Sequence, residues 1–203
     1  MTDILIVGVG GQGTLLASRV LGNIAMALGY DVKLSEVHGM AQRGGSVVTH
    51  VRFGDKVHSP VIDEAGADII LAFEKLEALR WAGRLKQNGS MFINTQQISP
   101  MPVVTGAEQY PADIEERIKE QVPGAVFVDA LSLAKQAGSE KAVNTVLIGV
   151  LAKNMAGSPK SHETFRGDNV DKQLFIDAIK ATVPEKLLDV NLEAFEKGYE
   201  FLD

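Results

Sequence analysis

The sequence predicts an α/β fold with a doubly wound, largely parallel sheet and a helical extension at its C-terminal end. Two segments of strand length, the apolar run at residues 4–7 and the segment 68–73, which is apolar after Asp68, are typical of strands buried on both faces. A helical pattern follows each run, and strands that alternate with helices indicate βαβ units and a parallel sheet. We therefore expect one α/β domain over residues 1–203, with residues 158–203 as the extension.

The remaining elements are expected in order along the chain. Apolar residues recur at every fourth position from 16 to 28 and predict the first helix, with Gly29 as its C-cap. Further strands are expected at residues 31–37, 46–53, 91–93 and 126–128, and a second helix at residues 76–81. The small, apolar stretch 144–155 predicts a buried helix, and two amphipathic helices are expected at residues 171–183 and 184–202.

Composition excludes several classes of protein. Hydrophobic residues make up 45% of the chain and charged residues 23%, as in a soluble globular protein. The net charge is -6 and no block of Lys or Arg could follow a phosphate backbone, so nucleic acid is not expected as a partner. No apolar stretch approaches the length of a membrane span, and no basic segment precedes the first apolar run. We expect a soluble, cytoplasmic protein that does not bind membranes.

A glycine-rich loop follows the first strand. Gly8, Gly10 and Gly13 have the G-x-G-x-x-G spacing of Rossmann-like dinucleotide sites, in the expected context of strand and helix. Such a loop brings backbone N–H groups and a helix N-terminus close to an anion. We expect phosphate or anion binding here; close packing of the helix on the strand is the structural alternative. The other candidates in and beside this loop are Gly11, Gln12, Thr14 and Glu36, whose carboxylate could bind a ribose.

A second unusual loop follows the second strand. It concentrates polar and glycine residues at the edge of the sheet where doubly wound folds bind ligands. Arg43, beside Gly44 and Gly45, suits a bidentate contact to phosphate or carboxylate, and His38 could carry a proton. The structural alternatives are an internal ion pair for Arg43 and an ordinary loop role for His38. The candidate residues of this loop are His38, Met40, Gln42, Arg43, Gly44, Gly45 and Ser46.

Together the two loops carry a family resemblance. GVGGQGT near the N-terminus, EVHGMAQRGGSVVTHVR, the Ala72-Phe73-Glu74 segment and the 144–149 helix resemble the gamma-domain family of 2-oxoacid:ferredoxin oxidoreductases. As a free-standing chain of this length, the sequence looks like the small (beta) subunits of the branch that acts on indolepyruvate and other arylpyruvates. The similarity is specific from Ile4 through Gly149 and becomes general after Gly157.

The resemblance implies a subunit of an oxidoreductase complex that decarboxylates an arylpyruvate, forms the aryl-acetyl-CoA and reduces ferredoxin. It also implies a large partner subunit that holds thiamine diphosphate and iron–sulfur clusters. We expect this chain to be inactive alone, where it could form a homodimer. The residues agree, because the chain has no cysteine to bind a cluster and lacks the usual thiamine diphosphate motif. The two loops would then contact CoA or the partner subunit, and no catalytic residue is assigned to this chain.

Two other functions stay open at this point. A stand-alone NAD(P)-dependent oxidoreductase would use the glycine loop and Glu36, and a nucleotide-sensing module would bind without turnover. No His and carboxylate spacing suits a metal, so no metal site is expected. Glu77 and Arg80 are expected to form a surface pair, and Glu74 stands at the end of a buried strand. His50 and His58 are expected to face solvent or to lie at the rim of the sheet.

Overall fold

Six strands form one mixed sheet in a computed structural model that describes residues 1–39, 44–157 and 170–202. The spatial order is β2-β3-β1-β4-β5-β6. The strands are β1 (Thr2–Val9), β2 (Asp31–His38), β3 (Ser46–Gly54), β4 (Ala67–Ala72), β5 (Leu85–Asn94) and β6 (Val126–Val128). Every strand predicted from the sequence is present, with β5 starting earlier than expected.

The sheet is largely parallel, as predicted, with one exception. β1 pairs with β4, β4 with β5 and β5 with β6 in parallel, but β3 is antiparallel to both β1 and β2. The connection from β2 to β3 is short, and a short connection produces a hairpin, since a parallel crossover needs a dozen or more residues. β3 therefore separates β2 from β1, while β2 still points in the same direction as β1.

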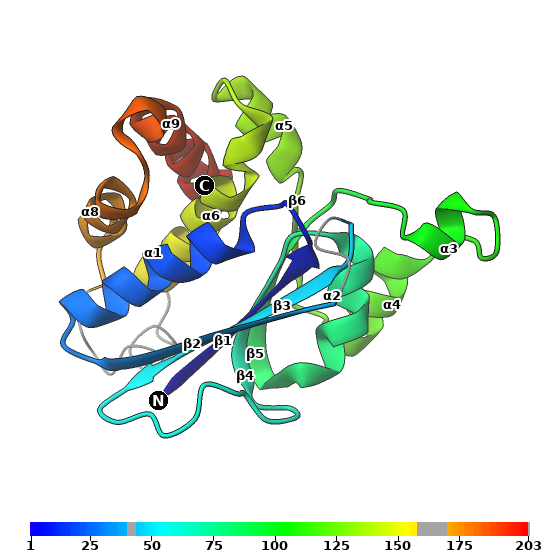
Figure 1. Ribbon diagram of the computed structural model, residues 1–203, viewed down its shortest axis with the longest axis horizontal. Helices are drawn as coiled ribbons and strands as arrows, with labels where there is room; N and C mark the ends of the chain where they lie inside the picture. The colour runs from blue at the N-terminus through cyan, green and yellow to red at the C-terminus, as the bar shows by residue number, and fades with distance from the viewer. Residues whose placement is uncertain (40–43, 158–169, 203) are drawn as a thin grey trace.

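Helices cover both faces of the sheet (Figure 1). One face carries α1 (Thr14–Ala27), α5 (Ala130–Gln136), α6 (Val143–Gly157), α8 (Lys172–Thr182) and α9 (Leu188–Tyr199). The other face carries α2 (Lys75–Trp81) and α4 (Ile114–Gln121). The short helices are α3 (Met101–Val104), η1 (Ala82–Arg84), η2 (Glu140–Ala142), η3 (Glu185–Leu187) and η4 (Glu200–Leu202). Helix α1 connects β1 to β2 across one face of the sheet, and α2 connects β4 to β5 across the other. The direction in which the chain winds along the sheet therefore reverses between β1 and β4.

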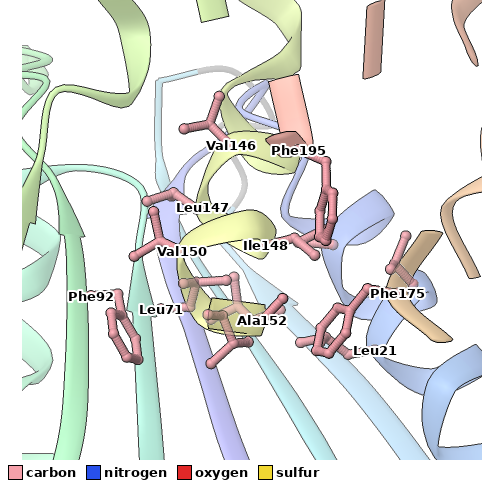
Figure 2. Packing of buried hydrophobic residues seen from close by; sticks show 14 of the residues in the cluster. Leu21, Leu71, Phe92, Val146, Leu147, Ile148, Val150, Ala152, Phe175 and Phe195 are labelled. Atoms are coloured by element: carbon pink, nitrogen blue, oxygen red, sulfur yellow. The ribbon is translucent and has the colours of Figure 1, made fainter. Parts of the chain in front are cut away.

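Helix α6 is the centre of the larger core. As the small, apolar sequence predicted, it is buried on nearly all sides, with Val146 and Ile148 fully inaccessible to solvent. Figure 2 shows its side chains between the sheet, represented by Leu71 and Phe92, and the C-terminal helices, represented by Phe175 and Phe195. The predicted amphipathic helices at the C-terminal end are therefore packed on this core through their apolar faces.

Two glycines allow α6 and α9 to approach each other closely. A Cβ atom at Gly149 would collide with the backbone carbonyl of Phe195, and one at Gly198 would collide with the carbonyl of Val146. The aromatic rings of Phe175 and Phe195 stack beside this crossing, with centroids 6.2 Å apart. The glycine at position 149 thus has a packing role in the core. Within the described ranges, no helix has both the length and the apolar character needed to cross a membrane.

Candidate functional site

The glycine loop leaves the end of β1 and starts α1, as predicted. Gly11 and Gly13 have φ angles of 104° and 84°, in the left-handed region that favours glycine. A Cβ atom at Gly13 would lie 2.7 Å from Nδ2 of Asn144 on α6, whereas one at Gly11 would meet nothing within 4 Å. No side chain caps the N-terminus of α1. Its first amides therefore face the open side of the loop, where an anion can accept from them.

Gln12 occupies the point where the winding of the sheet reverses. Its Oε1 accepts from the N–H of Val9 at 2.8 Å, and its Nε2 donates to the carbonyl of Phe73 at 2.8 Å. The Gln12 amide also lies 3.2 Å from Oε1 of Gln96, and Asn94 Nδ2 donates to the same Phe73 carbonyl at 3.0 Å. Open α/β sheets bind their ligands in this crevice. Here the side chains of Gln12, Asn94 and Gln96 lie at the base of this crevice.

The second loop lies against the first, although the two are distant in sequence. The N–H of Gly10 donates to the carbonyl of Gly45 at 2.9 Å, and the N–H of Gly44 donates to the carbonyl of Gly10 at 3.4 Å. His38 is exposed, and its Nδ1 lies 3.0 Å from the carbonyl of Gly39. The predicted residues Met40, Gln42 and Arg43 lie outside the described part of the chain.

One cavity, the Glu36 cavity, lies between the glycine loop and β2. It has a volume of about 450 Å³ and is lined by Gly10, Gly11, Gly13, Thr14, Leu15, Glu36, His38 and Val47. Oε2 of Glu36 lies 3.4 Å from the hydroxyl of Thr14 and 3.2 Å from that of Thr49. A carboxylate so close to the first turn of α1 already supplies negative charge to that helix end. This cavity is therefore better suited to a hydroxyl or a cation than to a phosphate.

A second cavity, the Lys141 cavity, lies on the other side of the glycine loop. It has a volume of about 470 Å³ and is lined by Gly10, Gly11, Gln12, Gly13, Gln96, Ile98, Leu131, Glu140, Lys141 and Val143. Glu140 pairs with Lys135 at 3.2 Å, and within the described ranges no carboxylate pairs with Lys141. The N-terminal ends of α1 and α6 both border this cavity. Two helix N-termini and one unpaired ammonium group favour an anionic ligand here.

Sequence reasoning missed the contribution of α6 to this site. Asn144 Nδ2 lies 3.4 Å from the carbonyl of Gly13, and its Oδ1 accepts from the N–H of Thr145 at 2.9 Å. The hydroxyl of Thr145 in turn donates to Oδ1 of Asn191 at 2.6 Å. A polar pair at the start of a buried, apolar helix is the signal that could have revealed it, because buried polar side chains need partners.

The predictions for the Glu77–Arg80 pair on α2 and for His50 on β3 were wrong. Glu77 and Arg80 do pair, at 2.8 Å, but Glu77 is buried and also accepts from the hydroxyl of Ser46 at 2.5 Å. The pair therefore connects α2 to the second loop and is not an ordinary surface pair. His50 is also buried, and its Nδ1 accepts from the N–H of Ile62 at 3.2 Å, because the loop before β4 covers it. His58 is exposed, as predicted.

Glu74 is fully buried directly after β4. Its Oε2 caps α2 by accepting from the N–H of Glu77 at 2.9 Å. Its Oε1 accepts from the N–H of Ile98 at 3.2 Å and from the hydroxyl of Tyr110 at 2.5 Å. Burial and the neighbouring carboxylate raise the pKa of Tyr110 well above its usual value, so the phenol stays a donor. Within the described ranges, no group of three acidic or His side chains could hold a metal ion.

Comparison with known proteins gives consistent matches over the whole chain. Residues 3–201 match the family described as pyruvate ferredoxin/flavodoxin oxidoreductase. The chain is 43% identical over 199 residues to the indolepyruvate oxidoreductase subunit IorB of Thermococcus kodakarensis, with coverage of 97% of this chain and 93% of that one.

Two solved structures have the same fold. Pyruvate oxidoreductase subunit PORC of Thermotoga maritima matches with a TM-score of 0.67 at 20% identity, covering 98% of this chain and 95% of that one. The 2-oxoglutarate:ferredoxin oxidoreductase of Magnetococcus marinus, solved with 2-oxoglutarate, coenzyme A and succinyl-CoA bound, matches with a TM-score of 0.63 at 15% identity. That match covers 100% of this chain but 31% of the longer chain.

Proposed function

This chain belongs to the pyruvate ferredoxin/flavodoxin oxidoreductase family, and we propose that it is the small subunit of an oxidoreductase that acts on indolepyruvate and related arylpyruvates. In the complete complex, the arylpyruvate loses CO₂, its acyl group is transferred to the thiol of CoA, and the released electrons reduce ferredoxin. The observation that carries this proposal is the 43% identity to an indolepyruvate oxidoreductase subunit across nearly the full length of both chains.

The cofactors of this reaction are assigned to a large partner subunit. Iron–sulfur clusters are normally held by cysteine thiolates, and these 203 residues contain no cysteine. The chain therefore does not fit a cluster, and it lacks the usual thiamine diphosphate motif. Decarboxylation and electron transfer then depend on cofactors outside this chain, and this chain completes the complex around them.

We further propose that the glycine-loop edge contacts CoA, with its phosphates at the Lys141 cavity. The uncapped N-terminus of α1, the N-terminus of α6 and Lys141, which pairs with no carboxylate of the described residues, supply positive potential on that side. The carboxylate of Glu36 disfavours phosphate on the opposite side of the loop. Arg43, which lies outside the described residues, would add a charge-assisted contact if its loop turns toward the same anion.

The dinucleotide alternative is less compatible with this geometry. A nicotinamide dinucleotide normally extends across the crevice where the winding of the sheet reverses. Gln12 occupies the base of this crevice through hydrogen bonds to Val9 and Phe73, and Gln96 lies directly beside it. Glu36 could still bind a ribose, but the rest of a dinucleotide would have to displace these contacts.

Reconstitution tests the proposal. The purified chain is mixed with the large thiamine diphosphate-dependent subunit from the same source, and the mixture is separated by size-exclusion chromatography. We expect one heteromeric species that carries iron and thiamine diphosphate, whereas this chain alone is colourless and carries neither. Stoichiometric iron or a flavin-like spectrum in the isolated chain, or independent migration of the two chains at micromolar concentration, would refute the proposal.

A further inference from the structure

A short arm leaves the sheet edge that carries the glycine loop. Between β5 and α4 the chain makes an excursion that carries α3, and Figure 1 shows α3 projecting from the body of the molecule. We call residues 98–110 the α3 arm. None of the four side chains of α3 is buried. Helix α3 thus faces the surroundings, whereas Tyr110 at the end of the arm packs against the core of this chain.

The arm nevertheless has a defined internal structure. The N–H groups of Val103 and Val104 both donate to the carbonyl of Pro100 at 3.0 Å, and Thr105 N–H donates to the carbonyl of Met101 at 2.9 Å. The N–H of Ala107 then donates to the carbonyl of Pro102 at 2.8 Å. Because these backbone groups bond to one another, the tip keeps its shape without support from the core, and little ordering is needed before it binds a partner.

Both ends of the arm are fixed to one buried carboxylate. Oε1 of Glu74 accepts from the N–H of Ile98 at the start of the arm and from the hydroxyl of Tyr110 at its end. Hydrogen bonds to a charged acceptor are stronger than those between neutral groups. A single side chain at the end of β4 therefore sets the position at which the arm leaves the sheet.

The tip of the arm is apolar and uncharged. Met101 is 67% exposed and Val104 is 65% exposed, more than any other large hydrophobic side chain in the described ranges. Residues 97–107 include no charged side chain, and no Lys or Arg occurs between Lys86 and Arg117. The buried centre of a protein–protein interface is depleted of charge and enriched in methionine. Such a tip fits an apolar pocket on a stable protein partner, and it does not fit a polyanion or a highly charged carrier protein.

We propose that the α3 arm is the docking element by which this chain binds the large subunit of the complex, with Met101 and Val104 in an apolar pocket of that subunit. Ile98, at the base of the arm, lines the Lys141 cavity, so the arm starts at the site proposed to serve the reaction. In the 2-oxoglutarate enzyme with the same fold, this domain is 31% of a longer chain and is covalently joined to the rest. A free-standing chain needs a non-covalent replacement for that connection. This inference rests on the proposed function.

The test uses the full chain and its large subunit. Met101→Glu, Val104→Glu and the double variant each place a carboxylate where an apolar contact is expected. Met26→Glu is the matched control, because Met26 is 57% exposed but lies near the far end of α1, at the opposite edge of the sheet. The dissociation constant of the heteromer is measured by titration calorimetry, and circular dichroism verifies that each variant is folded. We expect each single arm variant to weaken binding on the order of tenfold or more, and the control to bind like the wild type.

The outcomes separate the inference from the proposed function. If the wild-type chain binds the large subunit and the arm variants bind equally well, the docking role is refuted while the proposed function stands. If the variants abolish self-association of this chain but leave the heteromer intact, a second copy occupies the arm and the inference is again wrong. If the wild-type chain does not bind the large subunit at all, both fail.

Discussion

Nε2 of Gln12 lies 2.8 Å from the carbonyl oxygen of Phe73, so a side chain of the glycine loop joins the end of β1 to the end of β4. These are the two strands between which the winding of the sheet reverses. In a dinucleotide-binding protein that position is left open for the ligand. In this chain, the hydrogen bond from Gln12 to Phe73 occupies the position at which the G-x-G-x-x-G spacing predicts a bound dinucleotide.

Replacing Gln12 with Ala should therefore reduce stability more than an ordinary loop substitution. The variant loses the bond to Phe73 and leaves the N–H of the buried Val9 without its acceptor, which together cost about 2 kcal/mol of unfolding free energy. Urea denaturation measures the effect. Gln97→Ala is the control, because Gln97 is exposed, and we expect a change within about 0.5 kcal/mol. Equal stability of the two variants would mean that the Gln12 contacts do not hold the strands together.

The buried His50 predicts a dependence of stability on pH. Burial of the imidazole lowers its pKa below the usual 6.5, and the nearby Arg84 and Arg52 lower it further. Because the unfolded chain binds the proton more readily, the stabilisation is complete above pH 6.5 and is lost as the pH falls through the lower folded-state value. The urea midpoint of the wild type should drop between pH 7.5 and pH 5.5. His50→Gln should reduce this drop, whereas His58→Gln, at an exposed site, should leave it unchanged.

The contact between α6 and α9 predicts a large effect of a single methyl group. In Gly149→Ala the new Cβ meets the carbonyl of Phe195, and the helices must separate around a packed core. We expect a loss of about 1–3 kcal/mol in unfolding free energy, measured by thermal or urea denaturation. At Gly83 a Cβ meets nothing within 4 Å, so Gly83→Ala is the matched control. A tolerated alanine at position 149 would show that the two helices can be spaced further apart.

The proposed CoA contact is tested by kinetics of the reconstituted complex. Lys141→Ala should raise the KM for CoA on the order of tenfold, and Arg43→Ala about ten- to a hundredfold, because each removes a charge-assisted contact to phosphate. Lys56→Ala is the control, since Lys56 is exposed near the opposite edge of the sheet. If Arg43→Ala leaves the CoA kinetics unchanged but releases the large subunit, the second loop is an interface and not a CoA site.

Much of the fold could be predicted because its strongest sequence patterns are local. The continuous apolar runs at β1 and β4 follow directly from burial on both faces, and Gly29 ends α1 with a φ of 81°, as its position suggested. The antiparallel β3 was missed, because its residues alternate like any strand and only the short connection from β2 fixes its direction.

The site could be predicted in part for the same reason. The sequence alone places both loops at one edge of the sheet, since strands of one direction end at the same edge, and Gly10 does contact Gly45 there. Asn144 on α6 and Lys141 on η2 lie more than a hundred residues from the glycine loop, and no local pattern connects them to it. The burial of Glu77 likewise depends on Ser46, which only the folded chain brings close.

The most direct test of the account is a ferredoxin-reduction assay with indolepyruvate and CoA. Each subunit is assayed alone and then together, with and without CoA, and with NAD(P) in place of ferredoxin. We expect CoA-dependent reduction of ferredoxin only when both subunits are present, together with formation of the aryl-acetyl-CoA. Full activity of the large subunit without this chain, or NAD(P)-dependent turnover by this chain alone, would contradict the account.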